Sequence, residues 1–204
     1  MTEDRYAYEV LDLPAQLAGQ GALEEVLEAL VERFHVMRHL EGCGLRLPAA
    51  AMRRLARKLA VLLLDQAVHE RSDAPYISVW EEGRRKEIRM IYINPAIRRI
   101  TGYPAAQVLK VGFNIFVPDD TLTRIHGGAG GRLSEEIPIE AAREDREQMQ
   151  VAQRWEGIYQ VLKRDGTGYV KDVATIERVG TVFISCGTLI DVTAEHTPLS
   201  EAGP

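Results

Sequence analysis

The stretch IYINPAIRRITGYPAAQVLKVGFNIFVPDD, from Ile91 to Asp120, decides the fold. Its first apolar residues are typical of the end of a buried strand. Pro95 ends that strand and begins a short helix, because proline in the first helical turn loses no hydrogen bond. Gly102 ends the helix, since glycine adopts the left-handed C-cap conformation at little cost, and Pro104 begins a second helical turn. Short helices that follow a strand in this way lie across a sheet, and a ligand can bind beneath them.

Three motifs in this order resemble those of PAS sensor domains. The first is the strand followed by N-P-A, a short helix, T-G-Y and Q-V-L in the stretch above. The second is WEGIYQVLKRDGTGYVKDVATI (Trp155 to Ile176), which resembles the family's hairpin with its D-G turn. The third is FISCGTLIDVT (Phe183 to Thr193), which resembles its last strand and ends in D-[IV]-T. The resemblance covers residues 75–195 and implies an α+β fold, in which short helices accompany a five-stranded antiparallel sheet.

An N-terminal helical segment is expected before the PAS-like part. Apolar residues recur at helical spacing in the stripe Leu23, Leu27, Leu30, Phe34 and Met37. We predict helices over 23–41 and 48–70, separated by Gly42 to Gly44. The expected domains are this segment (1–72, for dimerisation and signal transfer), a sensor domain (75–195) and a disordered tail (196–204).

The last strand, which begins at Phe183, is uncharged on both faces by its period-2 alternation, so both faces should be covered. One cover is the ligand side, and the N-terminal helices are the expected cover of the other. Asp191 and Thr193 are expected to fix the end of the strand through local polar contacts.

A long insertion is expected at about 120–141. The cluster Gly127 to Gly131 predicts a mobile loop and not a phosphate-binding loop, because the G-K-[ST] ending is missing. The sequence AAREDREQMQVAQR, residues 141–154, then predicts a charged helix.

Composition limits the function classes. The chain has 204 residues, 46% of them hydrophobic, and a net charge of −5, so neither a nucleic-acid nor a membrane partner is expected. Cys43 and Cys186 show no pairing pattern, which favours free thiols in a reducing compartment. With no signal segment and no output domain after Thr193, we expect a cytoplasmic, non-enzymatic protein.

An apolar core beneath the short helices is the candidate ligand site. Two residues in it, Asn114 and Tyr159, can make polar contacts. The expected apolar lining is Ile93, Ile97, Ile100, Val108, Phe113, Phe116, Val161 and Leu189. A fully packed core without a ligand is the alternative.

The cofactor stays undetermined. Flavin-binding light-oxygen-voltage domains carry G-x-N-C-R-F where this chain has Ile115 and Phe116 after Asn114, so the photoreactive cysteine and the phosphate-binding arginine are missing. Leu189 stands where those domains carry a flavin-sensing glutamine, and a flavin is therefore not expected. Haem-binding PAS domains take an axial histidine from a short helix at this point. His126 has close to the required spacing, so haem remains open.

Two further histidines, His35 and His39, stand four residues apart on the first predicted helix, a spacing that can hold a metal, but no third ligand is evident. The run R-H-L-E-G around His39 faintly resembles a phospho-accepting motif, though it is one residue short and has Glu in place of Lys. We therefore expect a homodimeric sensory protein that binds a small ligand or a signalling partner. A haem-based sensor using His126 and a phosphotransfer protein using His39 are the alternatives.

Overall fold

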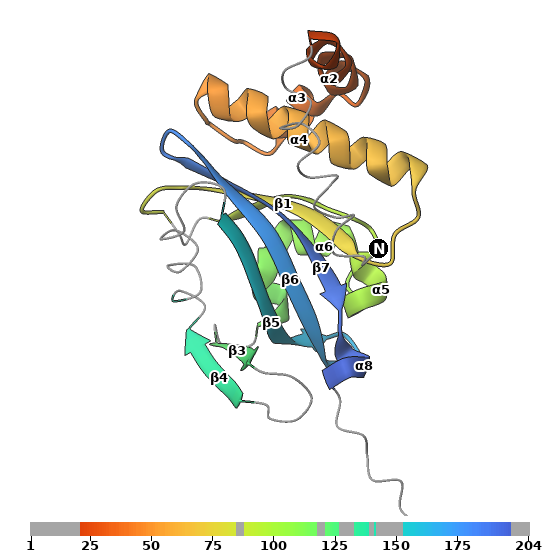
Figure 1. Ribbon diagram of the computed structural model, residues 1–204, viewed down its shortest axis with the longest axis vertical. Coiled ribbons are helices and arrows are strands. Elements are labelled where there is room, and N and C mark those ends of the chain that lie inside the picture. The colour runs from red at the N-terminus through yellow and green to blue at the C-terminus, as the bar shows by residue number, and fades with distance from the viewer. Residues whose placement is uncertain are drawn as a thin grey trace, which may run out of the picture.

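A computed structural model describes residues 21–84, 88–117, 121–126, 133–138, 141 and 153–196 (Figure 1). The glycine cluster, nearly all of the expected charged helix and the expected tail beyond residue 196 lie outside these residues. The elements in chain order are α2 (Gly21–Arg33), α3 (Val36–Gly42), α4 (Ala49–Val68), β1 (Ala74–Glu81), β2 (Arg89–Ile93), α5 (Ile97–Thr101), α6 (Ala105–Val111), the 3-10 helix η2 (Gly112–Phe116), β3 (Thr121–His126), β4 (Leu133–Pro138), β5 (Gln153–Lys163), β6 (Gly166–Val179), β7 (Val182–Asp191) and α8 (Thr193–His196).

One antiparallel sheet has the strand order β2-β1-β7-β6-β5-β3-β4. Its first five strands form the predicted PAS-like sheet, and the α+β fold is confirmed. The prediction of five strands is wrong, because the described residues form a sheet of seven. The residues of Thr121–His126, expected to form a loop, instead pair with β4 and β5. Threonine and isoleucine in that segment favour a strand, and the glycine-rich residues 127–131 fall in the connection between β3 and β4.

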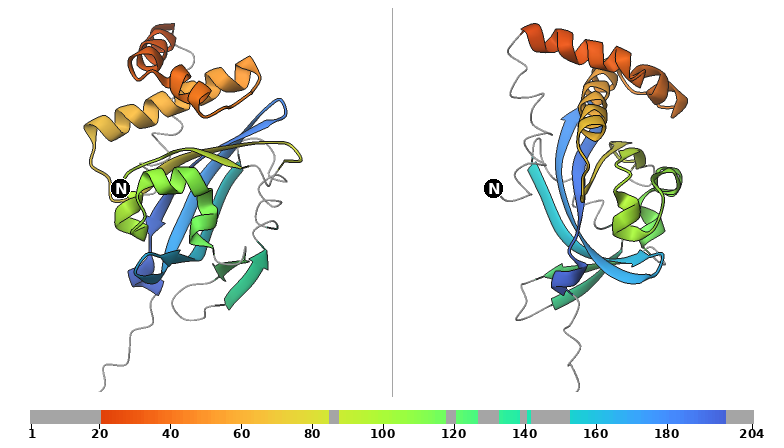
Figure 2. Two further views of the ribbon diagram at one scale, coloured as in Figure 1. Left: turned by 180° about the vertical axis from the view of Figure 1, so that it is seen from behind. Right: turned by 90° about the vertical axis from the view of Figure 1, so that its right-hand side faces the viewer.

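The two faces of the sheet bury separate clusters, as the last strand predicted. Phe183 and Leu189 of β7 belong to the cluster beneath α5, α6 and η2, which we call the inner face. Ile184 and Cys186 belong to the cluster beneath α4, which we call the outer face. Figure 2 shows α5 and α6 together on one side of the sheet. The end of β7 is fixed as expected, since the Thr193 amide donates to Asp191 Oδ1 at 2.9 Å.

The first predicted helix is broken in two. α2 ends at Arg33 and α3 begins at Val36, because His35 adopts a left-handed conformation with φ 50°. Histidine tolerates this region better than most residues. The break lets Val36 and Leu40 become fully buried with the residues of α4.

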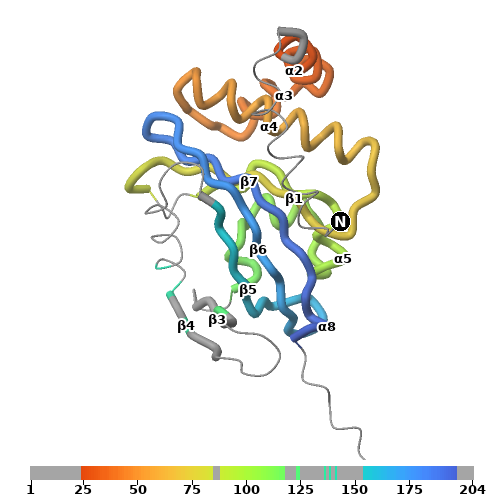
Figure 3. Tube along the Cα trace, in the orientation of Figure 1, coloured from red at the N-terminus to blue at the C-terminus, as the bar shows by residue number. Residues whose placement is uncertain are grey.

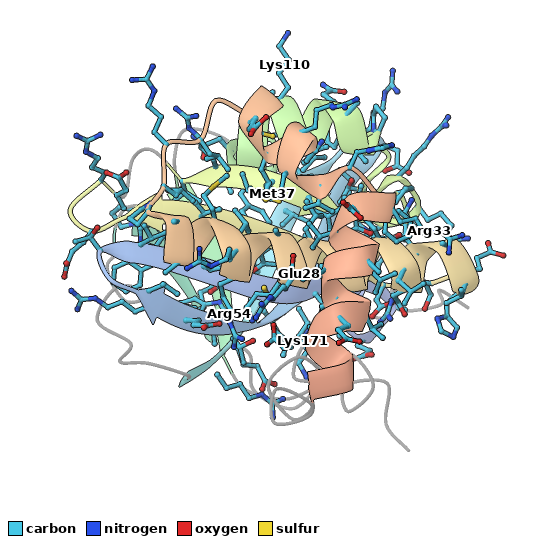
Figure 4. All side chains as sticks on the ribbon, turned by 90° about the horizontal axis from the view of Figure 1, so that it is seen from above. Glu28, Arg33, Met37, Arg54, Lys110 and Lys171 are labelled. Atoms are coloured by element: carbon cyan, nitrogen blue, oxygen red, sulfur yellow. The ribbon has the colours of Figure 1, made fainter. Side chains whose placement is uncertain are left out.

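The apolar stripe of the first predicted helix does not contact the last strand directly. α2 lies over α4, and it is α4 that covers the outer face (Figures 3 and 4). Leu27 is buried, Leu30 and Phe34 are half-buried, and Met37 is exposed. The chain therefore hides most of the stripe against its own helix α4.

Charged contacts add to the attachment of α4. Glu177 of β6 accepts from Arg54 Nε at 2.8 Å and lies 3.2 Å from the Lys58 ammonium. About one turn further along α4, Arg57 pairs with Glu24 and Glu28 of α2. Figure 4 shows α2 crossing α4 near Glu28, with Arg54 on the side of the sheet. No helix in the described ranges is long and apolar enough to cross a bilayer.

Candidate functional site

The predicted lining residues meet in one cluster on the inner face. Phe113 is half-buried against the cluster, and Asn114 is exposed and not part of it. In the 3-10 helix η2, side chains three residues apart share a side, so Phe113 and Phe116 turn inward while Asn114 turns outward. The buried members that were predicted are Ile93, Ile97, Ile100, Val108, Phe116, Tyr159, Val161 and Leu189.

Helix α5 is held against the sheet by its C-terminal turn. Gly102 has φ 80°, and its amide donates to Arg98 O. A side chain at Gly102 would bring its Cβ within 2.8 Å of Arg164 Cβ, in the turn between β5 and β6. The Arg164 amide in turn donates to Thr101 O at 2.9 Å. A glycine is therefore required by both the backbone conformation and the close approach of the hairpin.

A buried acid that the sequence analysis missed lies at the centre of the inner face. The Tyr76 hydroxyl donates to Asp172 Oδ1 at 2.9 Å, and the two residues are 0% and 3% exposed. The Tyr76 ring crosses β7 at Gly187, where an added Cβ would lie 2.6 Å from a ring carbon. Asp172 lies two residues from both Val170 and Ala174 along β6, and this period-2 spacing could have predicted that its side chain faces inward with theirs.

An arginine from the insertion reaches the β5 side of the inner face. Arg124 on β3 is opposite Tyr159 in the register. Its guanidinium carbon lies 5.4 Å from the centroid of the Trp155 ring and 5.9 Å from that of Tyr159, within the range of a cation–π contact. Arg124 was missed because the insertion was expected to be a loop.

A chain of polar contacts connects α4 to the start of α5. The Tyr92 hydroxyl donates to Gln66 Oε1 at 2.7 Å, and Asn94 Nδ2 donates to the Tyr92 oxygen at 3.4 Å. Asn94 Oδ1 then accepts from the Ala96 amide at 2.9 Å. Tyr92 and Asn94 are buried, and burial raises the pKa of Tyr92 to about 12. We call Gln66, Tyr92, Asn94 and Ala96 the polar link.

A second set of contacts joins α5 to the segment that follows α4. Arg99 of α5 donates to Glu70 at 2.6 Å and to the carbonyl oxygen of Arg71. Arg71 is itself buried between two carboxylates, with distances of 3.0 Å to Asp65 and 2.7 Å to Asp73. Burial opposes the charge of Arg71, but its bonds and ion pairs with these carboxylates hold its pKa above the usual value. Helix α5 is therefore tied to α4 directly by the polar link and indirectly through Arg71, which pairs with Asp65 of α4.

His35 and His39 lie on the helical segment, apart from the inner-face cluster. His126 lies in strand β3, not in the expected helix, and its side chain is outside the described part of the structure. His39 is exposed on α3, with Nε2 3.4 Å from Ile91 O and 3.8 Å from Cys43 Sγ. His35 occupies the break between α2 and α3. The described residues contain no group of three or more side chains that could hold a metal ion.

Comparisons with known proteins add little. No family model matches the chain, and no curated protein matches it. A solved structure described as "Structure of an RNA-binding Light-Oxygen-Voltage Receptor" is similar to it, with 16% sequence identity and a TM-score of 0.43. The match covers 95% of this chain and 64% of that receptor chain, so this chain spans less than two thirds of the receptor's length.

Proposed function

We propose that this chain is a non-enzymatic PAS-like sensory module. It binds a small ligand between the inner face and the helices α5, α6 and η2, and it signals through its N-terminal helical segment, residues 1–72. The observation that carries this proposal is the polar link, because it connects a wall of the core to Gln66 of α4 through the buried side chains of Tyr92 and Asn94.

Helix α5 belongs to both the core and the link. Ile97 and Ile100 are buried in the inner-face cluster, while the Ala96 amide just before them ends the polar link. A ligand that fills or empties the core displaces these isoleucines, because packed interiors transmit changes of volume. The displacement reaches α4 through the polar link and through the Arg99 contacts.

The output surface in this proposal lies on the helical segment. Val26, Met37, Leu64 and Val68 are large apolar residues that remain exposed there. We propose that these residues contribute to a homodimer or contact a signalling protein. Light scattering on the intact chain tests the first option: a Val26→Glu/Val68→Glu variant should be monomeric where the native chain is dimeric.

Hydrogen exchange tests the coupling itself. Ile100→Ala opens a cavity beneath α5, and it should speed exchange of the amides in the last two turns of α4. Val161→Ala opens a cavity in the same cluster but on β5, away from the link, and serves as the matched control. Equal acceleration in both variants, or none in Ile100→Ala, contradicts a route through α5.

A further inference from the structure

Two serines and a tryptophan occupy neighbouring positions on the inner face. Ser78 on β1 is directly opposite Ser185 on β7, and the next pair along these strands on the same face is Trp80 and Phe183. The rings of that pair stack with their centroids 5.3 Å apart and an angle of 8° between their planes. We call Ser78, Ser185 and Trp80 the donor row.

The donor row is shielded from solvent. Ser78 and Ser185 are 0% exposed, and Trp80 is 2% exposed. Within the described part of the chain, no residue supplies a hydrogen-bond partner to Ser78 Oγ, Ser185 Oγ or Trp80 Nε1. Buried polar groups without partners are costly and rare in native proteins. Three of them on neighbouring residues of one face indicate a partner that the described residues do not supply.

The chemistry of the donor row restricts that partner. An indole N–H can only donate, and each hydroxyl can donate, so the partner accepts hydrogen bonds. On the neighbouring strands, Ile176 of β6 is opposite Ser185 and Met90 of β2 is opposite Ser78, and neither side chain carries a charge. A charged partner would be desolvated there without a counter-ion. Arg178, which lies over the Phe183 ring, is already paired with Glu82 at 2.7 Å.

We propose that the ligand of the inner face is a neutral, planar ring compound with a carbonyl-type acceptor. The acceptor binds the donor row, and the ring lies against the Trp80 indole, because the Phe183 ring is already covered by Trp80 and by the Arg178 guanidinium. This inference rests on the proposed function, because it assumes a ligand in the core, and it adds the chemical class of that ligand.

Three probes of similar size test the proposal by equilibrium dialysis against the full chain. Coumarin is neutral, planar and carries a carbonyl; naphthalene has the same shape without an acceptor; coumarin-3-carboxylate adds a negative charge. We expect coumarin to bind at least tenfold more tightly than naphthalene, and more tightly than the carboxylate.

Variants assign that preference to the donor row. Ser78→Ala/Ser185→Ala should bind naphthalene as before and lose the preference for coumarin. Thr188→Val is the matched control. Thr188 Oγ1 is also buried on β7 without a partner among the described residues, but the alternation of side chains along β7 places Thr188 on the outer face. This variant should keep the preference. If circular dichroism shows that the double variant is unfolded, Ser78→Ala and Ser185→Ala are compared with the native chain separately, and each should show a reduced preference for coumarin over naphthalene.

The outcomes separate this inference from the proposed function. Equal binding of coumarin and naphthalene to the native chain overturns the ligand class and leaves a ligand-binding core, with water as the partner of the hydroxyls. A coumarin preference that survives in the serine variants, or tighter binding of the carboxylate, also overturns the ligand class. Binding of none of the three probes overturns both proposals.

Discussion

Removal of the Tyr76 hydroxyl should lower the free energy of unfolding more than removal of a tyrosine hydroxyl that donates no buried hydrogen bond. Tyr76→Phe deletes the donor that lies 2.9 Å from Asp172 Oδ1, in a site where both residues are shielded from water. Removing one partner of a buried hydrogen bond costs about 1–3 kcal/mol, and water cannot replace the lost donor here without opening the core. For a chain of this size we expect the melting temperature to fall by about 2–12 °C.

Urea unfolding followed by tryptophan fluorescence measures this change, because Trp80 and Trp155 both lie in the inner-face cluster. The transition midpoint should fall while its slope stays the same, which shows that stability changed and not the compactness of either state. Tyr103→Phe is the matched control, since Tyr103 packs on Phe116 from a half-buried position and no hydrogen bond of its hydroxyl is described. A loss below about 0.5 kcal/mol in Tyr76→Phe, similar to the control, would refute the idea of a water-excluded carboxylate at Asp172.

Three further predictions concern the link, the C-terminal turn of α5 and the cofactor. Folding raises the pKa of Tyr92 from about 10 to about 12, so the free energy of unfolding that depends on the neutral phenol is fully present below pH 10 and is lost as the pH rises toward 12. In Tyr92→Phe, the fall in the free energy of unfolding between pH 10 and pH 12 should be smaller by about 2–3 kcal/mol, as measured by unfolding titrations. Gly102→Ala should cost at least about 1 kcal/mol more than Gly83→Ala, since φ is +80° and +74° at the two glycines but only a Cβ at Gly102 meets Arg164; equal melting temperatures of the two variants would exclude the close approach. If the chain binds haem, His126→Ala should abolish the Soret band of a folded protein, and an unchanged spectrum excludes His126 as the axial ligand.

Local signals predicted the elements that local chemistry determines. Pro95 and Gly102 bound α5 closely because each acts through its own backbone conformation. The alternation of β7 predicted its two covers because side-chain direction has period 2 in any strand. These features required no knowledge of the residue that packs opposite.

Features that depend on distant partners were missed. Tyr76 and Asp172 are 96 residues apart, and only the strand order β1-β7-β6 places one ring across the glycine of the middle strand. The same applies to β3, whose place between β5 and β4 depends on pairing with β5, more than 30 residues later in the chain. The break at His35 depends on the fit of α3 to α4 and has no marker of its own, such as glycine or proline.

The geometry of the polar link suggests where a signal would be interrupted. The contact between Asn94 and Tyr92 is 3.4 Å, beyond the usual range of about 2.7–3.2 Å, whereas the contacts on either side of it are 2.7 and 2.9 Å. A displacement of α5 by about 0.5–1 Å therefore breaks this contact first, because hydrogen bonds weaken steeply with distance while apolar packing adjusts. The Arg99 side chain is long and can follow the same displacement without releasing Glu70. Ligand binding would in this way uncouple Asn94 from Tyr92 while the two helices stay attached, and α4 would change its contacts without leaving the sheet.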